Sequence, residues 1–236
     1  MNQNSLKSTT EYFLEEGKTN LRDCIRIAFE SALDRGIQTI IMFTGVGEGP
    51  MIAIREFLSK PEFAGIHIVA VTFPYGQRFE NNNEVEISIE TRRMLDENNI
   101  PLIRAHLPFN PITAHYRNHG ILGQDLTLIG NALSIFGGSM SLCVQAAIMA
   151  CDAGLFQLGD HVVSMTSDTA VIVRTAPTER LLTDFIVREI LCKPLYLTVG
   201  KGEEPFEDSA LESSIDDGGA VESGSGPQIL PPSRPD

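Results

Sequence analysis

Residues 36–50, G-I-Q-T-I-I-M-F-T-G-V-G-E-G-P, are the stretch of sequence that decides the fold. Residues 37–43 form a continuous, largely apolar and β-branched run, which is typical of a strand buried on both faces in a parallel sheet. Residues 44–50 form a glycine-rich turn in which Pro50 suits the first turn of a helix. The stretch therefore predicts a strand that passes through a tight turn into a helix, as in α/β folds.

The same alternation extends along most of the chain. Apolar residues three and four positions apart predict a helix over 20–35, capped by Thr19 or Asn20 and ended by Gly36 in the left-handed conformation. Further strands are predicted at 11–14, 66–73, 100–107, 161–165 and 170–175, and further helices at 50–58, 84–98, 122–136, 140–151 and 178–192. The last two strands are joined by too short a link for a crossover, so we expect a mostly parallel sheet with at least one antiparallel edge strand.

Composition indicates a cytoplasmic globular protein. Hydrophobic residues make up 42% of the 236 residues, yet no apolar run reaches the roughly 18 residues that a membrane helix needs. The first residues show no secretory signal. No two of the four cysteines form a CxxC pair, so we expect neither a zinc site nor a redox pair but reduced, buried thiols at Cys24, Cys143, Cys151 and Cys192.

Charge and composition divide the chain into three parts. Residues 200–236 are rich in Gly, Ser and Pro and hold nine acidic and two basic residues, so they carry −7 of the net charge of −13. We expect a flexible segment at 1–10, one domain at 11–199 and a disordered acidic tail at 200–236. The alternative for the tail is a docking peptide at 228–232. The acidic balance argues against nucleic acid as a partner.

Candidate binding residues come from the turns that follow the predicted strands. In an open α/β sheet, ligands bind beyond the carboxyl ends of the strands. This rule selects Lys18, Thr19, Thr44, Gly45, Gly47, Gly49, Thr72, Tyr75, Gly76, Ser167, Asp168 and Thr169.

The turn at 44–49 is the most informative of these. Its glycines allow backbone N–H groups to approach an anion, and the following helix adds a positive partial charge. The spacing of Gly45, Gly47 and Gly49 is not that of the dinucleotide fingerprint, and Glu48 would repel a phosphate. The alternative is a tight turn that only needs glycines. The 17–19 sequence Gly-Lys-Thr lacks the upstream glycine of a P-loop, so we reject an NTPase, although Lys18 could still reach an anion.

No complete catalytic constellation appears elsewhere. His106, His115 and His119, with two nearby arginines, could suggest a metal or phosphate site, but no acidic ligand accompanies them and surface histidines are favoured. Cys143 lies on an apolar helix face and is favoured as a core residue. No GxSxG elbow occurs, and turn formation alone explains residues 167–169.

Several of these segments together resemble a known family. They are residues 20–45, 69–72, 143–154 (C-V-Q-A-A-I-M-A-C-D-A-G), 168–173 (D-T-A-V-I-V) and 189–194 (E-I-L-C-K-P). They are similar to the stand-alone proteins related to the pyruvate kinase C-terminal domain, over nearly all of 11–194. The sequence departs from these relatives at 163–167, which has no glycine before the Asp-Thr-Ala of 168–170.

The resemblance implies a three-layer α/β/α sandwich with a mixed sheet. In pyruvate kinase that domain carries no catalysis and holds a regulatory sugar-phosphate site, and by similarity Thr44, Gly45 and Gly47 match its phosphate-binding turn. We therefore expect a non-catalytic or regulatory protein, without pyruvate kinase activity from this domain alone, that binds a phosphate-bearing ligand, a sugar phosphate or flavin mononucleotide (FMN). The alternatives are an enzyme of unknown reaction that uses such a ligand, and an assembly protein that acts through its tail. Each of these three functions is compatible with a homo-oligomer.

Overall fold

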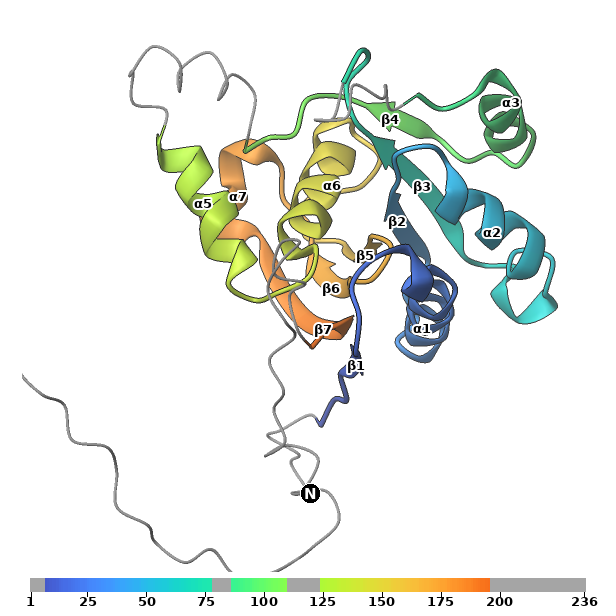
Figure 1. Cartoon of the computed structure of the whole chain (residues 1–236), viewed down its shortest axis with the longest axis horizontal. Coiled ribbons are helices and arrows are strands. Elements are labelled where there is room, and N and C mark those ends of the chain that lie inside the picture. The colour runs from blue at the N-terminus through green and yellow to red at the C-terminus, as the bar shows by residue number, and fades with distance from the viewer. Residues whose placement is uncertain (1–6, 78–85, 110–123, 196–236) are drawn as a thin grey trace, which may run out of the picture. The chain divides into compact units, whose positions relative to one another are not determined.

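The computed structural model of the chain describes residues 7–77, 86–109 and 124–195, and Figure 1 shows their arrangement. They form one seven-stranded sheet in the order β1-β7-β6-β5-β2-β3-β4. The chain divides into the unit Met1–Thr198 and the segment Val199–Asp236. The tail and the docking peptide predicted within it lie outside the described residues, as do residues 1–6 of the N-terminal segment.

The sheet is mixed, with a single reversed strand. The strands are β1 (Glu11–Phe13), β2 (Thr39–Phe43), β3 (His67–Thr72), β4 (Leu102–Arg104), β5 (His161–Met165), β6 (Ala170–Arg174) and β7 (Ile186–Pro194). Every neighbouring pair is parallel except for the two pairs that β6 makes with β5 and β7. The prediction of an antiparallel strand is confirmed, but its place at an edge is wrong, because β7 and β1 continue the sheet beyond β6.

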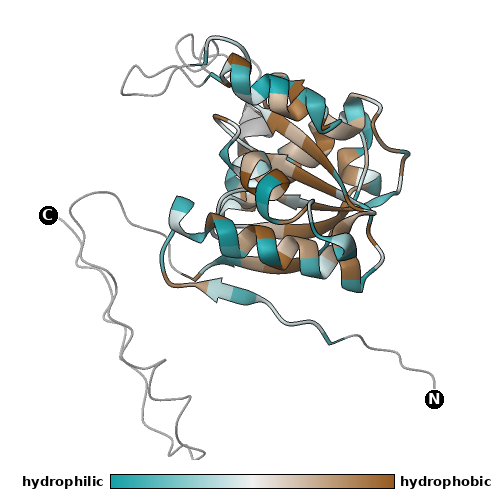
Figure 2. Cartoon of the chain, turned by 90° about the vertical axis from the view of Figure 1, so that its right-hand side faces the viewer, coloured by the Kyte–Doolittle hydropathy of each residue, from teal (hydrophilic) through white to brown (hydrophobic). Residues whose placement is uncertain are grey.

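Helices cover both faces of the sheet, and apolar residues concentrate along the strands between them (Figure 2). The α-helices are α1 (Leu21–Asp34), α2 (Glu48–Glu56), α3 (Ile89–Glu97), α5 (Gln124–Ser134), α6 (Met140–Asp152) and α7 (Leu181–Asp184), and short 3₁₀ helices span Lys18–Asn20, Pro61–Phe63 and Thr178–Arg180. Alternate strand residues such as Ile40 and Met42 pack with α1, whereas Ile41 and Phe43 pack with α6. This double burial explains the continuous apolar run of β2.

The last part of the domain is a strand where the sequence predicts a helix. A single helix over 178–192 is wrong, because the helical part ends at Asp184 and Ile186–Pro194 is strand β7. The apolar residues of this segment fit a helical period, but three are β-branched (Ile186, Val187 and Ile190), and β7 pairs with both β6 and β1. Tertiary pairing thus overrides the local pattern.

Smaller differences lie at element ends. The segment predicted as a third core strand is a three-residue edge strand, β4, and its residues are only half-buried. Neither Thr19 nor Asn20 caps α1 through its side chain, because the Asn20 amide donates to the Glu15 carbonyl at 2.6 Å. The left-handed Gly36 after α1 is confirmed, with a φ of 64°.

Candidate functional site

The predicted candidate turns meet at one edge of the sheet. Strands β1, β2, β3 and β5 run in the same direction, and the reversed β6 begins where β5 ends. The turns after these strands, at 14–20, 44–49, 73–76 and 166–169, therefore share the carboxyl edge. We call this the carboxyl-edge site.

A cavity of about 310 Å³ lies at this edge, near the lower limit of small-molecule pockets. Five of the twelve predicted residues line it: Lys18, Thr44, Gly45, Gly49 and Ser167. Ten further described residues line it that are not among the twelve, and they include five that lie in the predicted turns or directly beside them: Val46, Glu48, Phe73, Met165 and Thr166. The other five are Leu21, Met42, Phe43, Ser139 and Leu142.

Apolar side chains form much of the cavity wall. The rings of Phe43 and Phe73 meet edge to face, with centroids 4.8 Å apart. Met42 and Met165, from neighbouring strands, are almost fully buried, and Leu142 of α6 also lines the cavity. Such a wall accommodates an apolar or aromatic ligand body. Met42, Phe43, Phe73 and Met165 could have been indicated only by their positions at or near the predicted turns, and no such signal marks Leu142.

The turn at 45–49 supplies the polar part of the cavity. Among the described residues, no hydrogen-bond acceptor pairs with the backbone N–H groups of Gly45, Val46, Glu48 or Gly49. Glu48 and Gly49 are the first residues of α2, where N–H groups have no partner within the helix. These donors and the helix dipole make this part of the cavity favourable for an anion.

Thr44 and Gly47 give the turn its shape. The Gly47 N–H donates to the Thr44 hydroxyl at 2.9 Å. Gly47 has a φ of 91°, and a Cβ there would lie 2.4 Å from the Thr91 side chain of α3. The Thr72 hydroxyl, at the end of β3, donates to the Gly45 carbonyl at 3.4 Å. Gly47 and Thr72 are not among the residues that line the cavity, and their contacts position the turn.

Asp168 and Thr169 hold neighbouring loops together. The buried Asp168 carboxylate accepts from the Gly17 N–H at 2.8 Å and from the Thr169 hydroxyl at 2.9 Å. The Thr169 hydroxyl oxygen accepts from the Ser139 N–H, also at 2.9 Å. A Cβ on the left-handed Gly138 would lie 2.4 Å from that hydroxyl. The polar atoms of Asp168 and Thr169 are thus used within the protein, and the two residues do not line the cavity.

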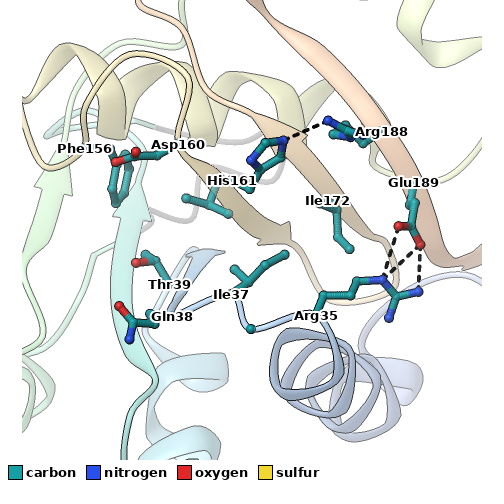
Figure 3. Close-up of a pocket in the computed structure, with 12 residues that line it drawn as sticks. Arg35, Ile37, Gln38, Thr39, Phe156, Asp160, His161, Ile172, Arg188 and Glu189 are labelled. Atoms are coloured by element: carbon teal, nitrogen blue, oxygen red, sulfur yellow. Dashed lines mark hydrogen bonds and ion pairs between the residues drawn. The ribbon is translucent and has the colours of Figure 1, made fainter.

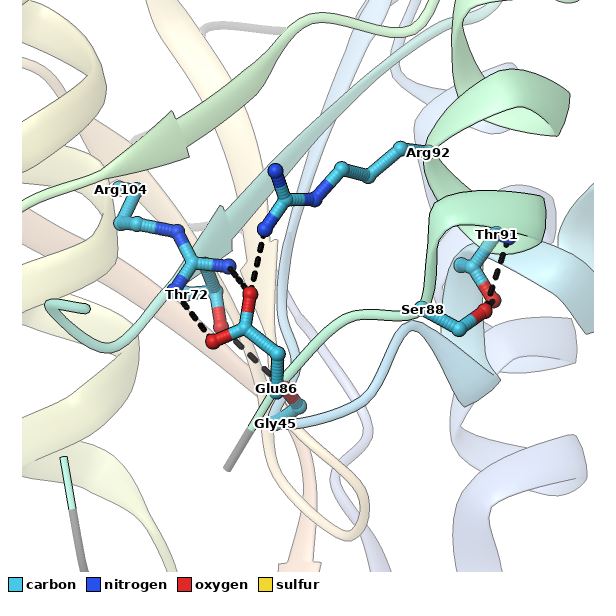
Figure 4. Close-up of polar contacts among 7 residues, drawn as sticks. All are labelled: Gly45, Thr72, Glu86, Ser88, Thr91, Arg92 and Arg104. Atoms are coloured by element: carbon cyan, nitrogen blue, oxygen red, sulfur yellow. Dashed lines mark hydrogen bonds and ion pairs between the residues drawn. The ribbon is translucent and has the colours of Figure 1, made fainter. Parts of the chain in front are cut away.

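Charged residues flank the turn on two sides. Lys18 forms an ion pair with Glu48 at 3.0 Å. The Glu86 carboxylate pairs with both Arg92 and Arg104 (Figure 4), and Arg104 is the neighbour of Thr72 in the β3–β4 pair. The sequence did not indicate that Glu86 and Arg92 form an ion pair, because this pairing depends on where α3 places Arg92. These five charged groups sum to one positive charge around the turn.

Three further predicted residues, in addition to Gly47, Thr72, Asp168 and Thr169, do not line the cavity. Thr19 is exposed in the short helix before α1. Tyr75 is 81% exposed, and Gly76 follows it in a turn with a φ of 74°. Most residues of the 44–49 turn line the cavity, but Thr19, Tyr75 and Gly76 do not.

The described residues contain no group of three or more His, Cys, Asp and Glu side chains arranged to hold a metal ion. Burial raises the pKa of the Cys143 thiol, as it does for Cys24, whose sulfur lies 3.5 Å from that of Cys192. These thiols resist ionisation, in keeping with core positions. The histidines at 115 and 119 lie outside the described residues, and no described helix is long and apolar enough to cross a membrane.

Comparison with solved structures finds several matches, and a pyruvate kinase chain is one of them. No protein-family model matches the chain. A crystal structure of pyruvate kinase from Cryptosporidium parvum is similar with a TM-score of 0.33 and 16% identity, over 69% of this chain and 24% of that one. The chain thus spans about a quarter of the length of that protein. A likeness of this strength does not place the chain in a family, so the resemblance found in the sequence stays a prediction.

Proposed function

We propose that the carboxyl-edge site binds a small molecule with a phosphate group and an apolar or aromatic body. One observation carries the proposal: the unpaired N–H groups of the 45–49 turn line the same cavity as Phe43 and Phe73. The phosphate would accept from the turn at the start of α2. The body would pack against the apolar wall.

Both ligands expected from the sequence carry a phosphate group. FMN adds an aromatic ring system, which suits the Phe43–Phe73 pair and the two methionine side chains of the wall. A sugar phosphate would leave this apolar surface less well matched. Of the two ligands, we therefore infer that FMN fits better, and that the protein acts by binding it in a sensing or storage role.

The ion pair of Lys18 and Glu48 sets the charge at the cavity mouth. Glu48 opposes an incoming phosphate, while Lys18 attracts it, and both side chains are well exposed. Since exposed ion pairs are weak, Lys18 can leave Glu48 and reach the phosphate at little cost. Glu48 therefore lowers the affinity of the site for a phosphate but does not prevent the phosphate from binding.

A matched pair of variants at Val46 tests the proposal. Val46 lies in the turn, lines the cavity and is 46% exposed, so substitution there leaves the core intact. Val46→Glu adds a negative charge beside the phosphate position, whereas Val46→Gln adds similar bulk without charge. Titrating each full-length protein with FMN, followed by flavin fluorescence, should show at least about a tenfold loss of affinity for Val46→Glu relative to Val46→Gln.

Two outcomes of this titration would count against the proposal. One is no saturable FMN binding to the unmodified chain, provided that phosphate and a sugar phosphate also fail. The other is equal affinity of the two Val46 variants, because a phosphate bound at the turn must respond to the added charge. Binding of the sugar phosphate alone would retain the site and replace FMN as its ligand.

A further inference from the structure

A second, larger cavity lies at the opposite edge of the sheet, with a volume of about 620 Å³ (Figure 3). Thr39 and His161, which line it, are the first residues of the parallel strands β2 and β5. The carboxyl-edge site lies beyond the other ends of these strands. We call the second cavity the amino-edge cavity, and none of the residues that the structure describes lines both cavities.

One acid in the amino-edge cavity is already neutralised. Arg35 donates to the Glu189 carboxylate through two nitrogens, the shortest contact being 2.7 Å, and the Ser8 hydroxyl donates at 2.8 Å. The hydrogen bonds from Arg35 are the main cause that lowers the pKa of Glu189. Arg35 and Glu189 therefore form a fixed, neutral pair at one end of the cavity (Figure 3).

Unlike Arg35, which binds a carboxylate, Arg188 contacts a histidine. Its Nη1 lies 3.1 Å from Nε2 of His161. A guanidinium can only donate, so a hydrogen bond at this position needs Nε2 as its acceptor. Within the described part of the chain, no carboxylate lies at ion-pair distance from Arg188. Among the described residues, its charge acts on Glu189 from beyond ion-pair distance, where it adds to the lowering of the Glu189 pKa, and no carboxylate is its direct partner.

The other polar groups do not supply that partner. The Asp160 carboxylate accepts from the Gln157 N–H at 2.9 Å, and in Figure 3 it lies on the far side of His161 from Arg188. Gln38 and Thr39 line the cavity with an amide and a hydroxyl. Phe156 adds an apolar surface on which the body of a ligand can pack.

We propose that the amino-edge cavity is a second small-molecule site, in which Arg188 binds an oxyanion, either a carboxylate or a phosphate group. The guanidinium fork matches the paired oxygens of both groups. The cavity volume lies within the range of small-molecule pockets. The proposal is independent of the carboxyl-edge site, because it uses other residues at the other edge.

Titration of the isotopically labelled full chain with acetate and with inorganic phosphate tests this site by NMR, at constant ionic strength. We expect saturable shifts of the His161 imidazole and Arg188 guanidinium nitrogens. Arg188→Gln should weaken binding at least about tenfold, since it removes a charge-assisted contact. Arg93→Gln is the matched control, because Arg93 is exposed and pairs with Glu97 on α3, and it should change nothing.

The two anions distinguish the source of the oxyanion. Binding of both indicates a general oxyanion site, and binding of phosphate alone indicates a phosphorylated ligand. Arg188→Lys keeps the charge without the fork and should bind with intermediate affinity. The proposal is overturned if neither anion gives saturable shifts, or if Arg188→Gln binds as the unmodified chain does. Arg188→Gln should leave FMN titration unchanged, so failure here and failure at the carboxyl edge are separable.

Discussion

Gly47 shows that a glycine selected as a binding residue has a structural role. Its backbone is left-handed, and a Cβ added there would lie only 2.4 Å from the Thr91 side chain, so both features exclude a side chain. We expect Gly47→Ala to destabilise the protein by about 2 kcal/mol or more, as measured by urea denaturation. In the sequence, the three glycines of this turn look alike. Only their backbone angles and their neighbours in the structure distinguish them.

Gly49 is the control for this prediction. It lies two residues further along, has no left-handed φ, and an added Cβ would make an ordinary contact at 3.6 Å with Leu21. Gly49→Ala should therefore change stability by less than about 1 kcal/mol and in the stabilising direction. Equal losses for Gly47→Ala and Gly49→Ala would show that the turn is not shaped as described.

Glu189 gives a prediction about pH. Hydrogen bonds from Arg35 lower its pKa in the folded protein, so its contribution is present above the unfolded value of about 4.3 and is lost as pH falls through the folded value. At pH 7, Glu189→Gln should cost about 1–2 kcal/mol in free energy of unfolding. Denaturation curves of both proteins should converge as pH falls below about 4. A cost that stays constant down to about pH 3 would contradict the role of this carboxylate.

At the scale of elements, local sequence predicted well where an element has a regular pattern and fixed ends. Strands β2, β3, β5 and β6 and helix α1 follow from apolar runs and from Gly36. Strand β7 could not be predicted in this way, since its apolar residues also fit a helix. Its strand form depends on pairing with β1, which lies about 180 residues earlier in the chain.

Ile186, the first residue of β7, allows a test of this assignment. It is 47% exposed, so secondary-structure preference should dominate the effect of substitution. In a strand, Ile186→Thr should be more stable than Ile186→Ala by about 0.5–1 kcal/mol. In a helix the order would reverse, because alanine favours helix over threonine. Thermal or urea unfolding of the two variants decides between them.

For the whole molecule, the sequence predicted which turns share one edge of the sheet better than which of their side chains line the cavity there. The four turns do share the carboxyl edge, because strand direction follows from the α/β alternation. Lys18, Thr44, Gly45, Gly49 and Ser167 line the cavity, whereas Asp168 and Thr169 are used in holding loops together. The apolar wall and the amino-edge cavity depend on contacts between distant segments, which no local pattern encodes.

The most direct test of the central claim is an NMR map of FMN binding on the labelled full chain. The account predicts saturable shifts centred on the backbone amides of Gly45, Val46, Glu48 and Gly49, which lack partners among the described residues. Shifts at Phe43 and Phe73 should accompany them. Saturable shifts confined to the residues around Arg188, or no shifts at all, would contradict a phosphate site at the carboxyl edge.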